Sequence, residues 1–139
     1  MSHADTVKHI YERVSHGDFQ PLLDSLAPDV QWSEAPNIPY DPGHAIVGPE
    51  ALQRLVLSRL DADFETFDVA VSRIVDGGSV VLVEGRYLGT TVSGTQLDAM
   101  MAHVWEFGDQ GTVVAFQQYS DTWQWRRVLG VDQPGPGTA

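Results

Sequence analysis

Two carboxylic acids and one histidine are the residues whose types and positions favour proton-transfer chemistry. His103 is the only polar residue at the odd-numbered positions of 97–107, a row that is otherwise apolar. Asp121 lies near the end of the following apolar segment, and Glu34 ends an earlier one. A carboxyl group at the rim of an apolar cavity has a raised pKa because burial disfavours its charged form, and this suits acid–base catalysis near neutral pH. A neighbouring imidazole could orient that acid or share its proton.

Each of these three residues has a structural explanation as well. A buried histidine is satisfied by one hydrogen-bonded neighbour, while Asp121 could cap a turn and Glu34 could be a solvated loop acid. On strict alternation Asp121 shares a strand face with Tyr119, and Phe116 lies on the other face. The alternation leaves open which face looks inward, because a β-bulge would exchange the two.

A cavity around these groups would be walled mainly by apolar and aromatic side chains. The residues predicted to contact a ligand there are Tyr11, Trp32, Tyr40, Met101, Trp105, Phe116 and Tyr119. Aromatic residues at strand positions are also ordinary core residues, so the same side chains are candidates for the core.

The elements that position these residues follow from the spacing of apolar side chains. Apolar residues recur at helical spacing in the first half of the chain, which predicts helices over about 2–17, 18–28 and 48–63. The period then changes to two, which predicts strands over about 67–75, 80–92, 96–107 and 112–123. A shorter strand is predicted at 30–34, followed by a proline-rich loop at 35–47. Gly85 and Gly89 lie inside a predicted strand and indicate bulges or bends.

The order of two helices, a strand, a helix and four strands (ααβαββββ) predicts an α+β fold. In this fold a curved, cone-shaped mixed sheet wraps around the N-terminal helices and leaves a hollow that is open at one end. We predict a single domain over residues 1–130 and a disordered tail, rich in Gly and Pro, over residues 131–139.

The composition argues against several classes of function. The chain has 139 residues, with 8 Lys and Arg against 19 Asp and Glu and a formal net charge of −11, so we expect no nucleic-acid binding. No cysteine is present and the five histidines show no metal-ligand spacing, so we expect no metal and no cofactor. The sequence shows no secretory signal and no long apolar segment, which predicts a cytoplasmic protein that does not bind a membrane.

Short motifs in a fixed order resemble those of the nuclear-transport-factor-2-like superfamily, and within it the SnoaL-like polyketide cyclases and the ketosteroid-isomerase-related proteins. These motifs span about residues 4–125 and are Gly17-Asp18, Trp32-Ser33-Glu34-Ala35-Pro36, Gly48-Pro49-Glu50-Ala51, Val83-Glu84-Gly85-Arg86-Tyr87, His103-Val104-Trp105-Glu106-Phe107 and Tyr119-Ser120-Asp121. The resemblance implies a cystatin-like, cone-shaped fold, a homodimer formed through the outer face of the sheet, and no cofactor.

The resemblance also implies roles for particular residues. Steroid isomerases move a proton with a carboxylate that follows the first strand, where this chain has Glu34. Their oxyanion-binding tyrosine falls at Ile10, next to Tyr11, and their oxyanion-binding acid falls at His103, so that oxyanion hole is not reproduced. Polyketide cyclases pair a late-strand aspartate with a pocket histidine, which implies Asp121 with His103.

These observations together favour a cofactor-independent enzyme that performs acid–base chemistry on an apolar, carbonyl-bearing small molecule such as a polyketide or a steroid-like compound. The reaction would be an isomerisation or an aldol-type cyclisation, with Asp121 as the acid or base, His103 as its partner and Glu34 as the rival base. The first alternative is a non-catalytic, homodimeric module that binds a small ligand. The second is an epoxide hydrolase or dehydratase of the same fold.

Overall fold

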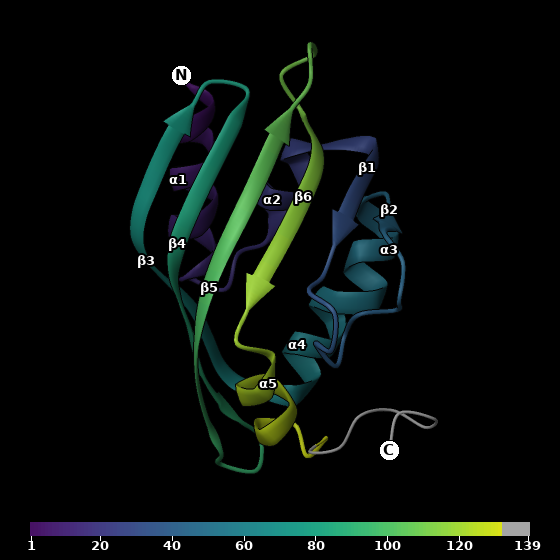
Figure 1. Ribbon diagram of the computed structural model, residues 1–139, viewed down its shortest axis with the longest axis vertical. Helices are drawn as coiled ribbons and strands as arrows, with labels where there is room; N and C mark the ends of the chain where they lie inside the picture. The colour runs from purple at the N-terminus through teal and green to yellow at the C-terminus, as the bar shows by residue number, and fades with distance from the viewer. Residues whose placement is uncertain (132–139) are drawn as a thin grey trace.

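The computed structural model describes residues 1–131, which form a curved sheet with the N-terminal helices on one side and a short C-terminal helix at its end (Figure 1). The helical elements are α1 (His3–Val14), α2 (Gln20–Ser25), α3 (Pro49–Leu52), a π-helical turn (Gln53–Leu57), α4 (Ser58–Asp63) and α5 (Thr122–Val128). The strands are β1 (Leu26–Ser33), β2 (Ile46–Val47), β3 (Phe64–Gly77), β4 (Val80–Thr91), β5 (Gln96–Phe107) and β6 (Val113–Ser120).

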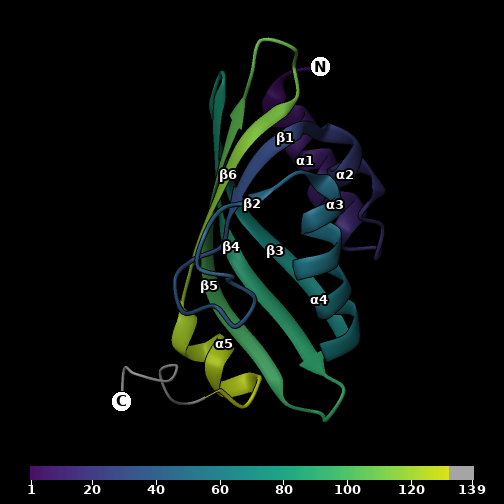
Figure 2. The same cartoon turned by 90° about the vertical axis from the view of Figure 1, so that its right-hand side faces the viewer.

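The strands form one mixed sheet in the order β2-β1-β6-β5-β4-β3. Strands β3 to β6 pair antiparallel with their neighbours in chain order, whereas β1 pairs parallel with β6. The sheet curves without closing, and α1 to α4 lie against its concave side (Figure 2). The predicted α+β class and the curved mixed sheet around the N-terminal helices are therefore confirmed.

Helix α1 forms for the reason that the sequence indicates. The Ser2 hydroxyl accepts from the backbone N–H of Asp5, and the Asp5 carboxylate accepts from the N–H of Ser2, which completes a capping box. The apolar stripe then buries Val7, Ile10 and Tyr11 against the sheet. Burying both Ile10 and Tyr11 matters for the site, because it turns the Tyr11 ring toward the interior.

The two glycines of β4 lie opposite irregularities in β3. Gly85 pairs with Val71, where the β3–β4 register shifts, and Gly89 pairs close to a second shift near Phe64. A Cβ atom on Gly85 would collide with the carbonyl oxygen of Ala70. The predicted bulges at these glycines are therefore present, and they allow β3 to approach β4 closely while the sheet curves.

The structure differs from the predictions at several boundaries. A short strand, β2, occupies Ile46–Val47 within the predicted loop at 35–47, and β3 extends over Phe64–Gly77 instead of 67–75. Strand β1 begins at Leu26, earlier than predicted, and Pro28 lies where the pairing of β1 with β6 is interrupted, a position that a residue without an N–H tolerates. Strand β6 ends at Ser120 instead of continuing to residue 123, because Asp121 caps a helix, α5, that was not predicted. Most of the predicted tail, residues 132–139, lies outside the described part of the chain.

Within residues 1–131, no helix is both long enough and apolar enough to cross a membrane.

Candidate active site

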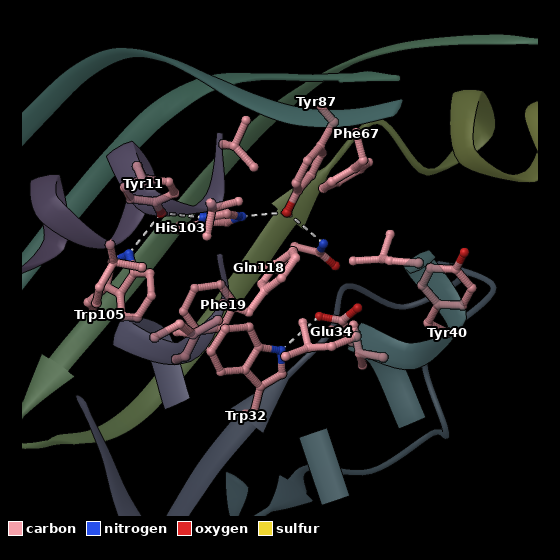
Figure 3. Close-up of a pocket in the computed structure, with 18 of the residues that line it drawn as sticks. Tyr11, Phe19, Trp32, Glu34, Tyr40, Phe67, Tyr87, His103, Trp105 and Gln118 are labelled. Atoms are coloured by element: carbon pink, nitrogen blue, oxygen red, sulfur yellow. Dashed lines mark hydrogen bonds between the residues drawn. The ribbon is translucent and has the colours of Figure 1, made fainter. Parts of the chain in front are cut away.

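The concave face of the sheet, α1, the π-helical turn and α4 enclose an apolar cavity of ≈ 70 Å³ (Figure 3). Its wall is mainly aliphatic and aromatic. The lining residues that carry a hydroxyl, carboxyl, imidazole or amide group are Tyr11, Glu34, Tyr40, Tyr87, His103 and Gln118. The cavity wall is therefore mostly apolar with a few polar groups, as is usual for small-molecule sites.

His103 occupies the centre of the polar part of the wall. It points inward from β5 with 5% of its surface exposed, in the alternation that the sequence predicts. Its Nδ1 atom contacts the hydroxyl of Tyr11, and its Nε2 atom contacts the hydroxyl of Tyr87. Burial lowers the pKa of His103 to about 3, because the charged imidazolium loses its hydration. At neutral pH the imidazole is therefore uncharged.

Both tyrosine hydroxyls receive a further hydrogen bond from outside the Tyr11–His103–Tyr87 chain. Trp105 Nε1–H donates to the Tyr11 hydroxyl at 2.9 Å, and Gln118 Nε2–H donates to the Tyr87 hydroxyl at 2.8 Å. The Gln118 amide is oriented by its oxygen, which accepts the backbone N–H of Ala35 at 3.0 Å. Burial raises the pKa of both tyrosines, so both hydroxyls keep their protons.

Glu34 is the carboxyl group of the cavity. It follows directly after β1 and is 7% exposed, and its Oε2 atom accepts the indole N–H of Trp32 at 3.0 Å. Burial raises its pKa to about 7, with the hydrogen bond from Trp32 acting in the opposite direction and the charge of Asp41 adding to the rise. A carboxyl group with this pKa exchanges protons readily at neutral pH.

The structure separates the other predicted acid from this group. Asp121 is exposed, and its side chain caps α5 by accepting the backbone N–H of Gln124 at 3.4 Å. The sequence left open which face of the last strand looks inward. In the structure the inward face of β6 carries Phe116 and Gln118. Asp121 therefore does not share the cavity with His103.

Five of the seven predicted ligand contacts line the cavity, namely Tyr11, Trp32, Tyr40, Trp105 and Phe116. Met101 is buried in the core but does not reach the cavity, and Tyr119 lies on the outer face of the sheet with 57% of its surface exposed. Among residues 1–131, no group of three or more His, Asp or Glu side chains is placed to hold a metal ion.

Residues 7–116 match the model of the SnoaL-like domain, which covers most of the chain. The chain belongs to the SnoaL-like domain family. No curated protein sequence matches it significantly.

Solved structures of related fold support the membership of this SnoaL-like chain. A nuclear-transport-factor-2-like protein from Burkholderia thailandensis E264 is 26% identical with a TM-score of 0.82, over 96% of this chain and 99% of that chain. A similar protein of unknown function from Burkholderia pseudomallei K96243 is 27% identical with a TM-score of 0.82, over 93% of this chain and 98% of that chain. IdmH from Streptomyces antibioticus, which is described as a proposed polyketide cyclase, shares the fold with a TM-score of 0.74. It is 21% identical, and the match covers 94% of this chain and 100% of that chain.

Sequence reasoning missed two polar residues of this SnoaL-like site. Tyr87 continues the inward-facing row of Val81 and Val83 in β4, and Gln118 lies two residues after the inward-facing Phe116. The period-two pattern of β4 could have placed Tyr87 on the inner face. Gln118 could be placed only after the inward face of β6 was known.

The loop at residues 34–45 closes one side of the cavity. The Tyr40 hydroxyl donates to Asp63 Oδ2 at 2.6 Å, at the end of α4. The Arg59 guanidinium lies over the Tyr40 ring at 4.6 Å from its centroid and donates to the carbonyl of Pro39. Tyr40 therefore fastens the loop to α4 while its ring forms part of the cavity wall.

Proposed function

We propose that this SnoaL-like protein catalyses proton transfer on a small apolar ketone, with Glu34 as the general base. The observation that carries the proposal is a buried carboxyl group with a pKa of about 7 in the same cavity as the Tyr11–His103–Tyr87 chain. Among residues 1–131, Glu34 is the only carboxylic acid that lines this cavity.

The residues support a balanced reaction. The Glu34 carboxylate removes a proton from the carbon next to the carbonyl, and the electron pair of that C–H bond moves onto the carbonyl oxygen to form an enolate. A neutral donor of the polar wall holds this oxygen. Where the ketone carries a C=C bond next to this carbon, the enolate is a dienolate. The protonated Glu34 then returns the proton to the γ-carbon, the double bond moves into conjugation with the carbonyl, and the isomerisation is complete.

An aldol-type cyclisation uses the same groups. The enolate carbon attacks a second carbonyl of the same molecule, a C–C bond forms, and the resulting alkoxide takes the proton back from Glu34. The likeness of fold to IdmH supports this variant. Because its pKa is about 3, His103 is neutral and acts through hydrogen bonds in either reaction.

The size of the cavity restricts the substrate. A cavity of ≈ 70 Å³ is about half the volume of one that holds benzene. A compact, one-ring ketone therefore requires less rearrangement of the wall than a polycyclic substrate, for which the loop at 34–45 would have to move.

Hydrogen–deuterium exchange at the α-carbons of cyclopentanone in D2O tests the proposal by NMR. We expect the wild type to exceed the buffer rate by about 10²-fold or more, the usual contribution of one positioned base, and Glu34→Gln to fall to the buffer rate. Asp121→Asn is the matched acid-to-amide control and should exchange like the wild type.

The other functions give different results. Binding of cyclopentanone without exchange would contradict the enzymatic proposal and favour a small-ligand-binding module. Incorporation of labelled oxygen from water into a small epoxide would favour a hydrolase instead.

A second copy of the chain is proposed as the partner. The outer face of the sheet exposes Leu82, Met100 and Tyr119, and these apolar side chains support the homodimer that the family resemblance implies. Sedimentation equilibrium of the wild type and of Met100→Glu tests it. The cytoplasmic location and the absence of a cofactor stay predictions.

A further inference from the structure

The buried polar chain contains more hydrogens than its own contacts can use. Four contacts link Trp105 to Tyr11, Tyr11 to His103, His103 to Tyr87, and Tyr87 to Gln118. A neutral imidazole has one N–H and one bare nitrogen, so it donates to one tyrosine and accepts from the other. The tyrosine that receives the imidazole N–H already accepts a second N–H, so its own hydroxyl hydrogen is left over.

The Gln118 amide adds a second unused hydrogen at one end of the chain. Its oxygen is fixed by the backbone N–H of Ala35, and one hydrogen of its nitrogen goes to Tyr87. The other amide hydrogen has no acceptor within residues 1–131. The indole of Trp105 at the opposite end has a single N–H, which Tyr11 already uses.

The end formed by Tyr87 and Gln118 is also the end nearer to Glu34. Gln118 bonds to Ala35, the residue after Glu34, and to Tyr87, and Figure 3 shows its amide between the Tyr87 hydroxyl and the Glu34 carboxyl. The charge of Glu34 acts on Tyr87 and contributes to its raised pKa, and no such contribution reaches Tyr11.

We propose that Tyr87 and Gln118 form the carbonyl-binding site of the cavity, donating one O–H and one N–H to a single ligand oxygen. His103 is a positioning residue in this scheme: its Nε2–H tautomer leaves the Tyr87 hydrogen free, and its Nδ1 accepts the hydrogen of Tyr11. The inference rests on the proposed function for the placement of the carbonyl near Glu34, but it concerns binding and not turnover.

This arrangement selects the kind of oxygen that binds. A ketone or enolate oxygen has two lone pairs and no hydrogen, so it satisfies both unused donors. An alcohol that donates to Tyr87 requires the other imidazole tautomer, and this leaves the Tyr11 hydrogen without an acceptor in the chain. An unsatisfied buried donor is costly, so the site should prefer ligands whose oxygen only accepts.

Infrared spectroscopy of bound cyclopentanone tests the proposal directly, because its carbonyl stretch lies above the protein amide bands and moves to lower frequency when the oxygen accepts hydrogen bonds. We expect a low-frequency shift in the wild type, a smaller one in Tyr87→Phe, and a frequency typical of apolar solvent in the double variant Y87F/Q118L. Tyr11→Phe removes the same hydroxyl group from the other end of the chain and should keep the full shift.

Affinity gives a second measurement. Each lost donor should raise the Kd of cyclopentanone by about 2- to 10-fold, the usual value of one hydrogen bond. The Kd of methylenecyclopentane, which has CH2 in place of the oxygen, should not rise. Where the double variant does not fold, Tyr87→Phe alone must still show the smaller shift and the weaker ketone binding.

Three results would overturn the proposal: a full shift in folded Y87F/Q118L, loss of the shift in Tyr11→Phe, or no detectable binding of cyclopentanone to the wild type. Glu34→Gln separates this inference from the catalytic proposal, because it should abolish exchange and keep the infrared shift. If the wild type shows the infrared shift but does not catalyse α-hydrogen exchange, the catalytic proposal is wrong and the carbonyl site stands. If it catalyses exchange without the infrared shift, the carbonyl site is wrong and the catalytic proposal stands.

Discussion

At the scale of single residues, burial acts in opposite directions on the two ionisable groups of the cavity. Glu34 is charged when deprotonated, so burial raises its pKa to about 7, whereas His103 is charged when protonated, so burial lowers its pKa to about 3. Near neutral pH the histidine is uncharged and Glu34 exists in both protonation states. The cavity therefore holds one group that exchanges a proton and another that only donates and accepts hydrogen bonds.

The first prediction concerns the pH dependence of exchange. Only ionised Glu34 can remove a proton, so the rate of α-hydrogen exchange should rise with pH through an apparent pKa of about 7 and become constant above it. Measurement of cyclopentanone exchange between pH 5 and 9, as deuterium incorporation, checks this profile. A rate that stays constant between pH 5 and 9 would contradict the assignment of Glu34 as the base.

The second prediction concerns Asp121 itself. Asp121→Ala removes the side chain that caps α5, so it should lower the free energy of unfolding by about 0.5–2 kcal/mol and leave exchange unchanged. Urea denaturation measures the loss, and Asp121→Asn is the control because asparagine caps helices as well as aspartate does. Loss of exchange in folded Asp121→Asn would contradict Glu34 as the base and would favour Asp121, the acid predicted from the sequence.

The individual site residues differ in how far the sequence could predict them. His103 and Trp105 follow from simple alternation in β5, which the structure keeps throughout. The inward face of β6 depends on the register irregularity between Glu106 and Phe107, and no local pattern in the sequence marks it. The placement of Gln118 inside the cavity, and of Asp121 outside it, could therefore be established only from the structure.

At the scale of elements, the helices and long strands were predictable because their apolar periods are long and regular. The end of β6 was not, because Thr122 and Trp123 continue a strand-like composition after Ser120. The signals for α5 were present: Asp121 as the cap, Trp125 and Val128 at helical spacing, and Gly130 after the last turn. A cap followed by a three-residue apolar spacing outweighs β-propensity here, because the indole of Trp125 becomes buried against the aromatic core.

The third prediction concerns the loop at residues 34–45. Tyr40→Phe removes the hydrogen bond to Asp63 and keeps the ring in the wall. Amide hydrogens of residues 35–45 should then exchange about 2- to 10-fold faster, the equivalent of one net hydrogen bond, and cyclopentanone should associate faster. Hydrogen-exchange mass spectrometry of this loop and stopped-flow binding measure the two effects.

His44→Ala is the control for the loop, because His44 is an exposed side chain in the same segment that bonds to the neighbouring carbonyl of Ala45. It should leave both rates unchanged. Unchanged amide protection in Tyr40→Phe would show that the bond to Asp63 does not limit opening of the loop.

At the scale of the whole molecule, the two buried groups make opposite contributions to the dependence of stability on pH. The folded state binds a proton at Glu34 between about pH 4.5 and 7 that the unfolded state has lost, so stability from this group falls as the pH rises. The unfolded state binds a proton at His103 between about pH 3 and 6.5 that the folded state lacks, so stability from this group falls as the pH drops. Between about pH 4.5 and 6.5 the two slopes cancel.

The fourth prediction separates these contributions with Glu34→Gln, which keeps an oxygen for the Trp32 indole and removes the titration. Relative to the wild type, the variant should gain about 3 kcal/mol in free energy of unfolding between pH 4.5 and 7, because each pH unit over which the proton count differs is worth about 1.4 kcal/mol. The variant alone should become more stable as the pH rises toward 6.5, the slope left by His103, while the wild type stays nearly flat. Urea denaturation at intervals from pH 4 to 8.5 measures both curves. Parallel curves for the two proteins would show that Glu34 titrates as an exposed carboxylate, and the general base proposed here would then lose the buried environment on which its role depends.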